Sequence, residues 1–232
     1  KEAMDDIYKE GKIPTIVGGT GFYIQALLYD ISFEEEEHSA VRTYYENLAA
    51  EKGNGFLHDM LKEVDPVSAE EIHENNVKRV IRALEYYEIN QEPISAHNQR
   101  ERQKESPYEA CYFVLTDERK RIYERIDKRV DMMLEEGLVA EVTSLKEKGY
   151  HKDMVSMQGL GYKEILDYLN GDISLERAVY LIKRDTRHFA KRQLTWFRRE
   201  KNVTWVNKPD FQYDNDLILE YMITKMKENS IL

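Results

Sequence analysis

A glycine-rich turn near residue 20 is the first group of residues that could do chemistry. Gly18, Gly19, Thr20 and Gly21 follow a run of β-branched residues and precede a helical pattern. Glycines let the backbone approach a ligand, and the N–H groups of the following helix favour an anion such as a diphosphate. The Thr20 hydroxyl could bond a phosphate or an edge of a substrate. A tight strand-to-helix turn also needs glycine, and taken alone the pattern favours this structural explanation.

The pattern over residues 174–200 predicts a long helix with a cationic ridge. At about 100° per residue, four cations fall within about 60° of one another: Arg184, Arg187, Lys191 and Arg198. An apolar stripe lies opposite and consists of Ala178, Ile182, Phe189 and Trp196. Such a ridge suits a phosphodiester backbone, where each cation displaces a counterion. Pairing with acidic neighbours is the alternative, and we favour the polyanion because only Asp185 and Glu200 interrupt the cations.

Two further helices carry cations. Over residues 76–88, Lys78, Arg79 and Arg82 lie away from an apolar stripe with helical spacing, which is a weak signal unless this helix and the cationic ridge face one groove. Over residues 118–135, Lys and Arg mingle with Glu and Asp, so pairing between residues four apart is the simpler explanation.

A second glycine-containing segment precedes a predicted helix at residues 162–169. It contains Gln158, Gly159, Leu160, Gly161, Tyr162 and Lys163. A base stacked on Tyr162 and a phosphate on Lys163 would suit RNA. A loop between helices with a tyrosine in the core explains the same residues equally well.

The commoner catalytic sets are absent from the sequence. The six histidines are scattered without the spacing of metal ligands, so we expect no metal held by the protein alone. The single cysteine, Cys111, lies in an apolar stretch that suits the core. No Gly-x-Ser-x-Gly elbow of a hydrolase and no Gly-Lys-Ser/Thr of a Walker A loop is present.

The elements that must position these residues follow an α/β pattern. The predicted order is helix 1–10, strand 13–17, helix 22–29, strand 112–116, helices 118–135, 137–148, 162–169 and 174–200, strand 203–206 and helix 214–228. Between them, residues 40–51, 55–64, 66–73 and 76–88 read as helices, preceded by the acidic run 34–37 and followed by the polar stretch 97–106. We therefore expect a helix-rich α/β core with a parallel sheet, formed by residues 1–35 and 107–232, and an inserted all-helical domain at 36–106.

Composition is typical of a folded protein of the reducing cytoplasm. The 232 residues are 41% hydrophobic and carry a net charge of −10, which rules out disorder. The longest apolar run spans residues 110–115, so no membrane span and no membrane partner are expected. One cysteine excludes internal disulfides. Residues 177–201 hold nine cations against two acids, a net +7 within an acidic chain.

Taken in order, these segments resemble the bacterial tRNA dimethylallyltransferase family. The matching pieces are residues 18–23, 41–42, 64–66, 78–85, 159–163 and 186–196, which together span nearly the whole chain. Several spaced motifs in the right order are far more specific than any one of them.

The resemblance implies a P-loop-kinase-like core and a helical insertion that contacts RNA. It also implies transfer of a dimethylallyl group from dimethylallyl diphosphate to N6 of the adenosine 3′ of the anticodon, in tRNAs that read codons starting with U. Such a base must leave the stack to reach a buried site. The implied partners are the tRNA anticodon stem-loop and dimethylallyl diphosphate, Mg²⁺ is bound with the diphosphate, and we expect a monomer.

Roles follow the matching residues only. Thr20, with Gly18, Gly19 and Gly21, corresponds to a substrate-contacting turn beside the reacting adenosine, and Arg42 corresponds to a tRNA contact. The other RNA-contacting residues are Lys78, Arg79, Arg82, Gln158, Gly159, Gly161, Tyr162 and Lys163. Arg187, Lys191 and Arg192 would hold phosphates of tRNA or of the diphosphate.

One departure from the family pattern bears on activity. Family members carry a P-loop and a general-base Asp upstream of the Gly-Gly-Thr-Gly turn, and the chain begins at Lys1 without either. We therefore expect an absent N-terminal portion, and an inactive polypeptide without it. Two other functions stay open on the residues alone, a non-catalytic RNA-binding module and a relative of nucleotide kinases. A further alternative, closer to the tRNA enzyme, is prenylation of free adenosine nucleotides.

Overall fold

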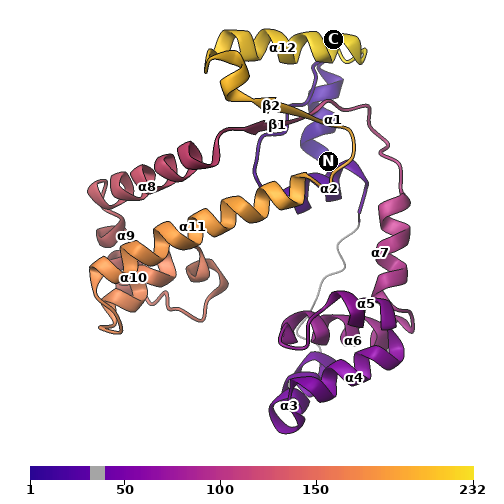
Figure 1. The fold of residues 1–232 in the computed structure, drawn as a ribbon, viewed down its shortest axis with the longest axis vertical. Helices are drawn as coiled ribbons and strands as arrows, with labels where there is room; N and C mark the ends of the chain where they lie inside the picture. Colours follow the sequence, from indigo (N-terminus) through magenta and orange to yellow (C-terminus); the bar gives the residue numbers. More distant parts are fainter. Residues whose placement is uncertain (32–39) are drawn as a thin grey trace. The chain divides into compact units, whose positions relative to one another are not determined.

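A computed structural model describes residues 1–31 and 40–232. The chain divides into two compact units (Figure 1). Unit 1 consists of residues 1–16 and 22–108, and unit 2 of residues 17–21 and 109–232. The acidic run 34–37 lies outside the described residues.

Unit 1 is helical throughout its regular elements. These are α1 (Glu2–Lys9), α2 (Gly21–Leu28, whose first residue belongs to unit 2), α3 (Ala40–Lys52), α4 (Asn54–Val64), α5 (Pro66–Glu71), α6 (Val77–Asn90) and α7 (Ile94–Gln103). The helices expected between residues 40 and 88 are all present, with ends shifted by one or two residues. No separate helix was predicted over the polar stretch 97–106, and α7 extends through most of it.

A single apolar core holds the α3–α7 cluster together. Leu57 and Leu61 of α4 are fully buried and pack with Val80, Ile81 and Leu84 of α6. The last three have the helical spacing that the sequence indicated. Burial of these side chains from two helices stabilises the cluster mainly through the hydrophobic effect.

A buried carboxylate joins two helices of this cluster. The Oδ1 atom of Asp65 accepts hydrogen bonds from the Ser68 amide at 3.0 Å and the Ser95 hydroxyl at 2.6 Å. Its Oδ2 atom accepts from the Ser68 hydroxyl at 2.7 Å and the Ser95 amide at 3.0 Å. Burial would raise the pKa of Asp65, but these four hydrogen bonds outweigh it and hold the pKa below its usual value. Asp65 thereby satisfies free amides at the start of both α5 and α7.

The strand expected at residues 13–17 is not formed. Ile13, Ile16 and Val17 lie in irregular backbone and are exposed by 42%, 44% and 91%. A strand requires a hydrogen-bonded neighbour, and among the described residues the only paired strands are β1 (Tyr112–Thr116) and β2 (Val203–Asn207). The β-branched composition of the segment was therefore insufficient to make it a strand.

Unit 2 contains the sheet and a second helical cluster. Strands β1 and β2 pair in parallel, with Tyr112 opposite Val203 and Thr116 opposite Asn207. Its helices are α8 (Arg119–Glu135), α9 (Leu138–Glu147), α10 (Tyr162–Leu169), α11 (Leu175–Phe197) and α12 (Asn215–Glu228), with short 3₁₀ helices η1 (Val155–Gln158) and η2 (Lys208–Phe211). All the α-helices and both strands lie where the sequence placed them. The two 3₁₀ helices were not anticipated.

The core of unit 2 lies among α8, α9, α10 and α11. Val130, Val142, Ile165, Ala178 and Ile182 are almost completely buried there. The apolar stripe expected on the long helix is thus confirmed at Ala178 and Ile182. It is wrong at Phe189, which is 41% exposed because the core ends before that turn of α11.

The division into segments 1–35, 36–106 and 107–232 stays a prediction. Among the residues that the structure describes, no helix is both long enough and apolar enough to cross a membrane.

Candidate active site and nucleic-acid interface

The glycine turn of unit 2 is held by α11. The side-chain amide of Gln193 donates a hydrogen bond to the Gly19 carbonyl at 2.7 Å. A Cβ atom at Gly19 would overlap that amide, and one at Gly21 would overlap the indole ring of Trp196. Close approach of α11 is therefore the physical reason for glycine at both positions. Neither helix residue was among the expected site residues.

Thr20 stands at the apex of this turn. Its side chain is exposed and makes no hydrogen bond to any described residue. The hydroxyl is therefore available to a ligand, while Gln193 and Trp196 fix the backbone on either side of it. The substrate-contacting role of Thr20 stays a prediction. An exposed hydroxyl on a fixed backbone is consistent with that role.

Part of the cationic ridge is engaged within unit 2. Arg187 donates to Asp127 of α8 at 2.5 Å, and Arg184 binds its neighbour Asp185 at 2.8 and 3.0 Å. Arg187 is three-quarters buried, so its guanidinium ties α11 to α8. The acid-pairing alternative therefore describes these two arginines, and phosphate binding by Arg187 would require it to share or leave Asp127.

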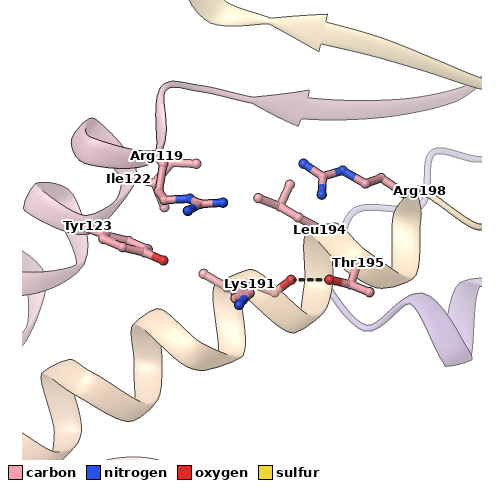
Figure 2. Close-up of a pocket in the computed structure, with 8 residues that line it drawn as sticks. Arg119, Ile122, Tyr123, Lys191, Leu194, Thr195 and Arg198 are labelled. Atoms are coloured by element: carbon pink, nitrogen blue, oxygen red, sulfur yellow. Dashed lines mark hydrogen bonds between the residues drawn. The ribbon is translucent and has the colours of Figure 1, made fainter.

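The remaining cations of the ridge line a small pocket between α8 and α11. The α8–α11 pocket is formed by Arg119, Ile122, Tyr123, Ala190, Lys191, Leu194, Thr195 and Arg198. Figure 2 shows the guanidinium groups of Arg119 and Arg198 directed into the same space from opposite sides. None of Arg119, Lys191 and Arg198 forms an ion pair with a described residue. Three cationic residues thus line a cavity of about 50 Å³.

Arg192 points to a different surface of α11. Its guanidinium lies 5.7 Å from the centre of the Phe189 ring, within the range of a cation–π contact. An exposed arginine beside an exposed aromatic ring is a pattern that single-stranded RNA exploits through stacking. The phosphate contact expected of Arg192 stays a prediction.

The segment from Gln158 to Lys163 forms the entry to α10. Gly161 has φ +101°, which favours glycine, and its amide donates to the buried carboxylate of Glu164 at 2.8 Å. The Tyr162 hydroxyl donates to Glu141, which raises the pKa of Tyr162, and its ring packs against the unit 2 core. The segment is thus a rigid helix start. Base stacking on Tyr162, phosphate binding by Lys163 and RNA contact by Gln158, Gly159 and Gly161 stay predictions.

The expected RNA contacts of unit 1 lie on α3 and α6. Arg42 donates to the Glu85 carboxylate from Nε at 3.2 Å and from Nη2 at 2.7 Å. Glu85 is almost completely buried, and Arg82 lies 3.9 Å from it. Lys78 and Arg79 are exposed and form no ion pair within the described part of the chain. Arg42 is therefore anchored inside the cluster, whereas Lys78 and Arg79 project from it.

A metal held by protein side chains does not fit the residues seen here. Within residues 1–31 and 40–232, no three His, Cys, Asp or Glu side chains come together as a potential metal site.

Sequence reasoning missed two groups of functional candidates. Gln193 and Trp196 lie three residues apart, and helical spacing does place them on one face, but nothing local shows that this face meets the glycine turn. Arg119 was interpreted as one of many cations paired along its own helix. Such pairing is observed for Arg121 with Asp117 and Lys120 with Glu124, but not for Arg119.

Comparison with known proteins identifies relatives over the full length of the chain. A curated tRNA dimethylallyltransferase from Lachnoclostridium phytofermentans is 56% identical over all of this chain and 74% of its own length. Another from Acetivibrio thermocellus is 50% identical over 93% of this chain and 69% of its own length.

Solved structures give the same result for the fold. A tRNA isopentenylpyrophosphate transferase from Bacillus halodurans matches 99% of this chain and 72% of its own, with 38% identity and a TM-score of 0.65. A eukaryotic dimethylallyltransferase captured acting on tRNA has a TM-score of 0.74 at 24% identity and supports the fold alone. The expected helix-rich α/β class with a parallel sheet is confirmed.

The model of the IPP transferase family matches residues 1–200. With relatives at 50% and 56% identity and solved structures of the same fold, this chain belongs to the IPP transferase family.

Proposed function

We propose that this protein transfers a dimethylallyl group from dimethylallyl diphosphate to N6 of the adenosine 3′ of the anticodon, in tRNAs that read codons starting with U. The observation that carries the proposal is the Gly18–Gly21 turn. Gln193 and Trp196 hold it against α11 and leave the Thr20 hydroxyl free, in a member of a prenyltransferase family. A non-catalytic RNA-binding module would not need this turn, and curated relatives named tRNA dimethylallyltransferase favour the enzyme over a nucleotide kinase.

The reaction is a substitution at the first carbon of the dimethylallyl group. The adenosine N6 lone pair forms the new C–N bond, and the C–O bond to the diphosphate breaks. Diphosphate leaves with the bonding electrons, and a base takes the proton from N6. Cations near the leaving group stabilise its developing charge.

Thr20 acts on the nucleophile in this proposal. Its hydroxyl accepts a hydrogen bond from the N6 amine and orients the lone pair toward the allylic carbon. Because Gln193 fixes the Gly19 carbonyl, the hydroxyl is held in place before the substrate arrives. A base flipped out of the anticodon loop would be required to reach it.

The RNA is held by cations of both units in this proposal. Lys78, Arg79 and Arg82 of unit 1 and Lys163, Lys191 and Arg192 of unit 2 contact backbone phosphates. Gly18, Gly21, Gln158, Gly159, Gly161 and Tyr162 approach nucleotides through backbone and ring surfaces. Arg42 and Arg187 stay bound to the carboxylates of Glu85 and Asp127, respectively. In this way they position the surfaces that carry them.

Mg²⁺ enters this scheme with the diphosphate. Oxygens of the diphosphate would supply ligands to the ion. The ion would neutralise leaving-group charge when bound.

The test is direct modification of RNA. The protein, extended at its N-terminus by the portion that carries the P-loop and general-base Asp in family members, is incubated with unmodified tRNA, dimethylallyl diphosphate and Mg²⁺, and the digested nucleosides are examined by mass spectrometry. We expect adenosine carrying one five-carbon unit, at the position 3′ of the anticodon. Tight tRNA binding without this product would overturn the enzyme in favour of a binding module. Product on free adenosine nucleotides but not on tRNA would overturn the substrate assignment.

A further inference from the structure

We propose that a clamp of three residues at the start of α8 positions the Arg119 side chain for the reaction. The clamp consists of Asp117, Arg121 and Tyr213, which all belong to unit 2 and do not line the α8–α11 pocket. Arg119 does line that pocket, together with Lys191. The inference rests on the proposed function, in which cations hold phosphates of the substrates. The clamp residues act through Arg119, so they are positioning residues and not catalytic ones.

The clamp lies where both parallel strands end. Asp117 directly follows β1, and Tyr213 follows β2 through η2. The Tyr213 hydroxyl donates a hydrogen bond to Asp117 Oδ1 at 3.2 Å, and the Arg121 guanidinium lies 3.7 Å from the centre of the Tyr213 ring. Arg121 Nε lies 3.4 Å from Asp117 Oδ2. Each member of the clamp therefore contacts the other two.

Burial of Asp117 gives these contacts their importance. Its side chain is only 4% exposed, and its Oδ2 atom accepts no hydrogen bond from a described residue. A buried carboxylate is costly unless nearby charge and hydrogen bonds compensate it. Arg121 supplies the charge, and Tyr213 and the Glu118 amide supply hydrogen bonds to Oδ1. Burial and the hydrogen bond to Asp117 raise the pKa of Tyr213, so the hydroxyl keeps its proton and remains a donor.

The backbone that carries the Tyr213 ring has an unusual conformation. Gln212 and Tyr213 have φ angles of +53° and +63°, which residues other than glycine rarely adopt. Such a conformation costs free energy and persists only where surrounding contacts hold it. On its far side, Asp214 caps α12 by accepting hydrogen bonds from the amides of Asp216 and Leu217. The turn is therefore held between the end of β2 and the start of α12, with the Tyr213 ring against α8.

The clamp and the pocket lie on opposite sides of the first turn of α8. Residues two apart in an α-helix are separated by about 200° around its axis, so Arg119 and Arg121 point in nearly opposite directions. Arg121 contacts Tyr213, whereas Figure 2 shows Arg119 directed into the space between α8 and α11. Glu118, at the N-cap of α8, makes no capping hydrogen bond with its side chain. The clamp therefore supplies the side-chain contacts that fix this turn.

A fixed first turn restricts Arg119 before a substrate binds. A flexible cation must lose conformational freedom when it contacts a phosphate, and this loss weakens binding and slows the reaction. A cation that is already in place stabilises developing charge without that cost. Loosening the clamp should therefore slow the reaction, and it should do so only while Arg119 is present.

The first experiment measures the clamp itself by hydrogen exchange of the N-terminally extended protein. Tyr213→Phe keeps the ring beside Arg121 and removes the hydroxyl. The Ile122 amide makes the first helical hydrogen bond of α8, to the Glu118 carbonyl at 3.0 Å. We expect amides 122–124 to exchange about fivefold faster in Tyr213→Phe, with the rest of α8 unchanged. The control is Tyr221→Phe, because this partly buried hydroxyl makes no hydrogen bond to a described residue. Unchanged exchange at amides 122–124 would overturn the clamp.

The second experiment tests positioning through the kinetics of dimethylallyl transfer. The effect of Tyr213→Phe on kcat/KM is measured in the wild type, in Arg119→Gln and in Lys120→Gln. We expect about a fivefold loss in the wild type and no further loss in Arg119→Gln, because residues that act as one unit are not additive. Lys120 is the matched control, since it is the adjacent cation and belongs to neither clamp nor pocket. The fivefold loss should persist in its background. Single-turnover conditions with excess enzyme keep slow variants measurable.

An equal loss from Tyr213→Phe in all three backgrounds would overturn the proposal, because the clamp would then serve the fold alone. The absence of any loss in the wild type would overturn it as well. If the wild type transfers no dimethylallyl group, the proposed function fails and the positioning role fails with it. Faster exchange at amides 122–124 would still show that the clamp holds α8, so failure of the clamp and failure of the proposed function are distinguishable.

Discussion

In the α3–α7 cluster each buried carboxylate is matched by donors of the same chain, whereas in the α8–α11 pocket three cations converge with no described acid. Asp65 receives four hydrogen bonds and Glu85 a two-point arginine contact. Arg119, Lys191 and Arg198 surround a cavity instead. Charges matched inside the chain serve the fold, because removing either partner leaves a buried charge uncompensated. Charges left unmatched around a cavity are available to a ligand.

The largest effect is expected where the matching in the α3–α7 cluster is broken. Arg42→Leu removes the two-point arginine contact of the buried Glu85 carboxylate, from which Arg82 lies 3.9 Å away. We expect a loss of about 3 kcal/mol in the free energy of unfolding, measured by denaturant titration. The double variant Arg42→Leu with Glu85→Leu should regain most of it. If the single variant is as stable as wild type, the contact does not hold the cluster together.

Asp65→Asn tests the same principle at a helix junction. An amide cannot accept all four hydrogen bonds, so amides at the start of both α5 and α7 lose a strong acceptor. At about 1 kcal/mol for each helix cap, we expect a loss of about 2 kcal/mol at neutral pH.

The pH dependence of unfolding sharpens this prediction. Because the pKa of Asp65 is held below its usual value of about 4, the carboxylate stabilises the native state at all higher pH. This contribution is lost as pH falls through the lowered native pKa. The difference in unfolding free energy between wild type and Asp65→Asn should therefore shrink in acid, and a constant difference would contradict the assignment.

Thr20→Ala examines a side chain of unit 2 that makes no described contact. We expect turnover of tRNA to fall about tenfold, which is about 1.4 kcal/mol in the activation barrier. The unfolding midpoint should stay within the range of surface substitutions, about 0.5 kcal/mol. A loss of stability without a loss of turnover would make Thr20 a turn residue only.

Gln193→Leu removes the amide that holds the Gly19 carbonyl. A neutral hydrogen bond is worth about 1 kcal/mol, so turnover should fall about fivefold, with KM for tRNA little changed. Tyr180→Phe is the control on the same helix, because its hydroxyl is exposed and makes no described hydrogen bond. Equal effects of the two variants would show that the hydrogen bond does not position the turn.

Arg187→Gln gives the smallest expected change in stability. Its partner Asp127 is partly exposed, so the ion pair contributes about 0.5 kcal/mol.

Charge reversal of Arg187 and Lys191 together should weaken tRNA binding and flatten its salt dependence. Unchanged binding would remove both residues from the RNA interface.

Local periodicity explains which parts of the fold were predictable. The limits of β1 and α10 follow directly from the residue pattern, because a short run of aromatic and β-branched residues and helical spacing are both signals within a few neighbouring residues. The segment 13–17 has the same β-branched character as β1 and still forms no strand, since pairing depends on another segment. The extent of α7 was missed because a polar helix without an apolar stripe has no periodic signal.

The residues of the candidate site were predictable from the sequence, but the contacts between them were not. The sequence by itself determined the glycine turn, the concentration of positive charge on α11 and the motifs shared with the IPP transferase family. Only the tertiary structure decided that Gln193 meets Gly19, that Arg187 binds Asp127 and that Arg119 faces Arg198. These contacts join residues between 60 and 174 positions apart. Sequence spacing fixes which side chains share a helix face, but the packing of helices fixes what that face meets.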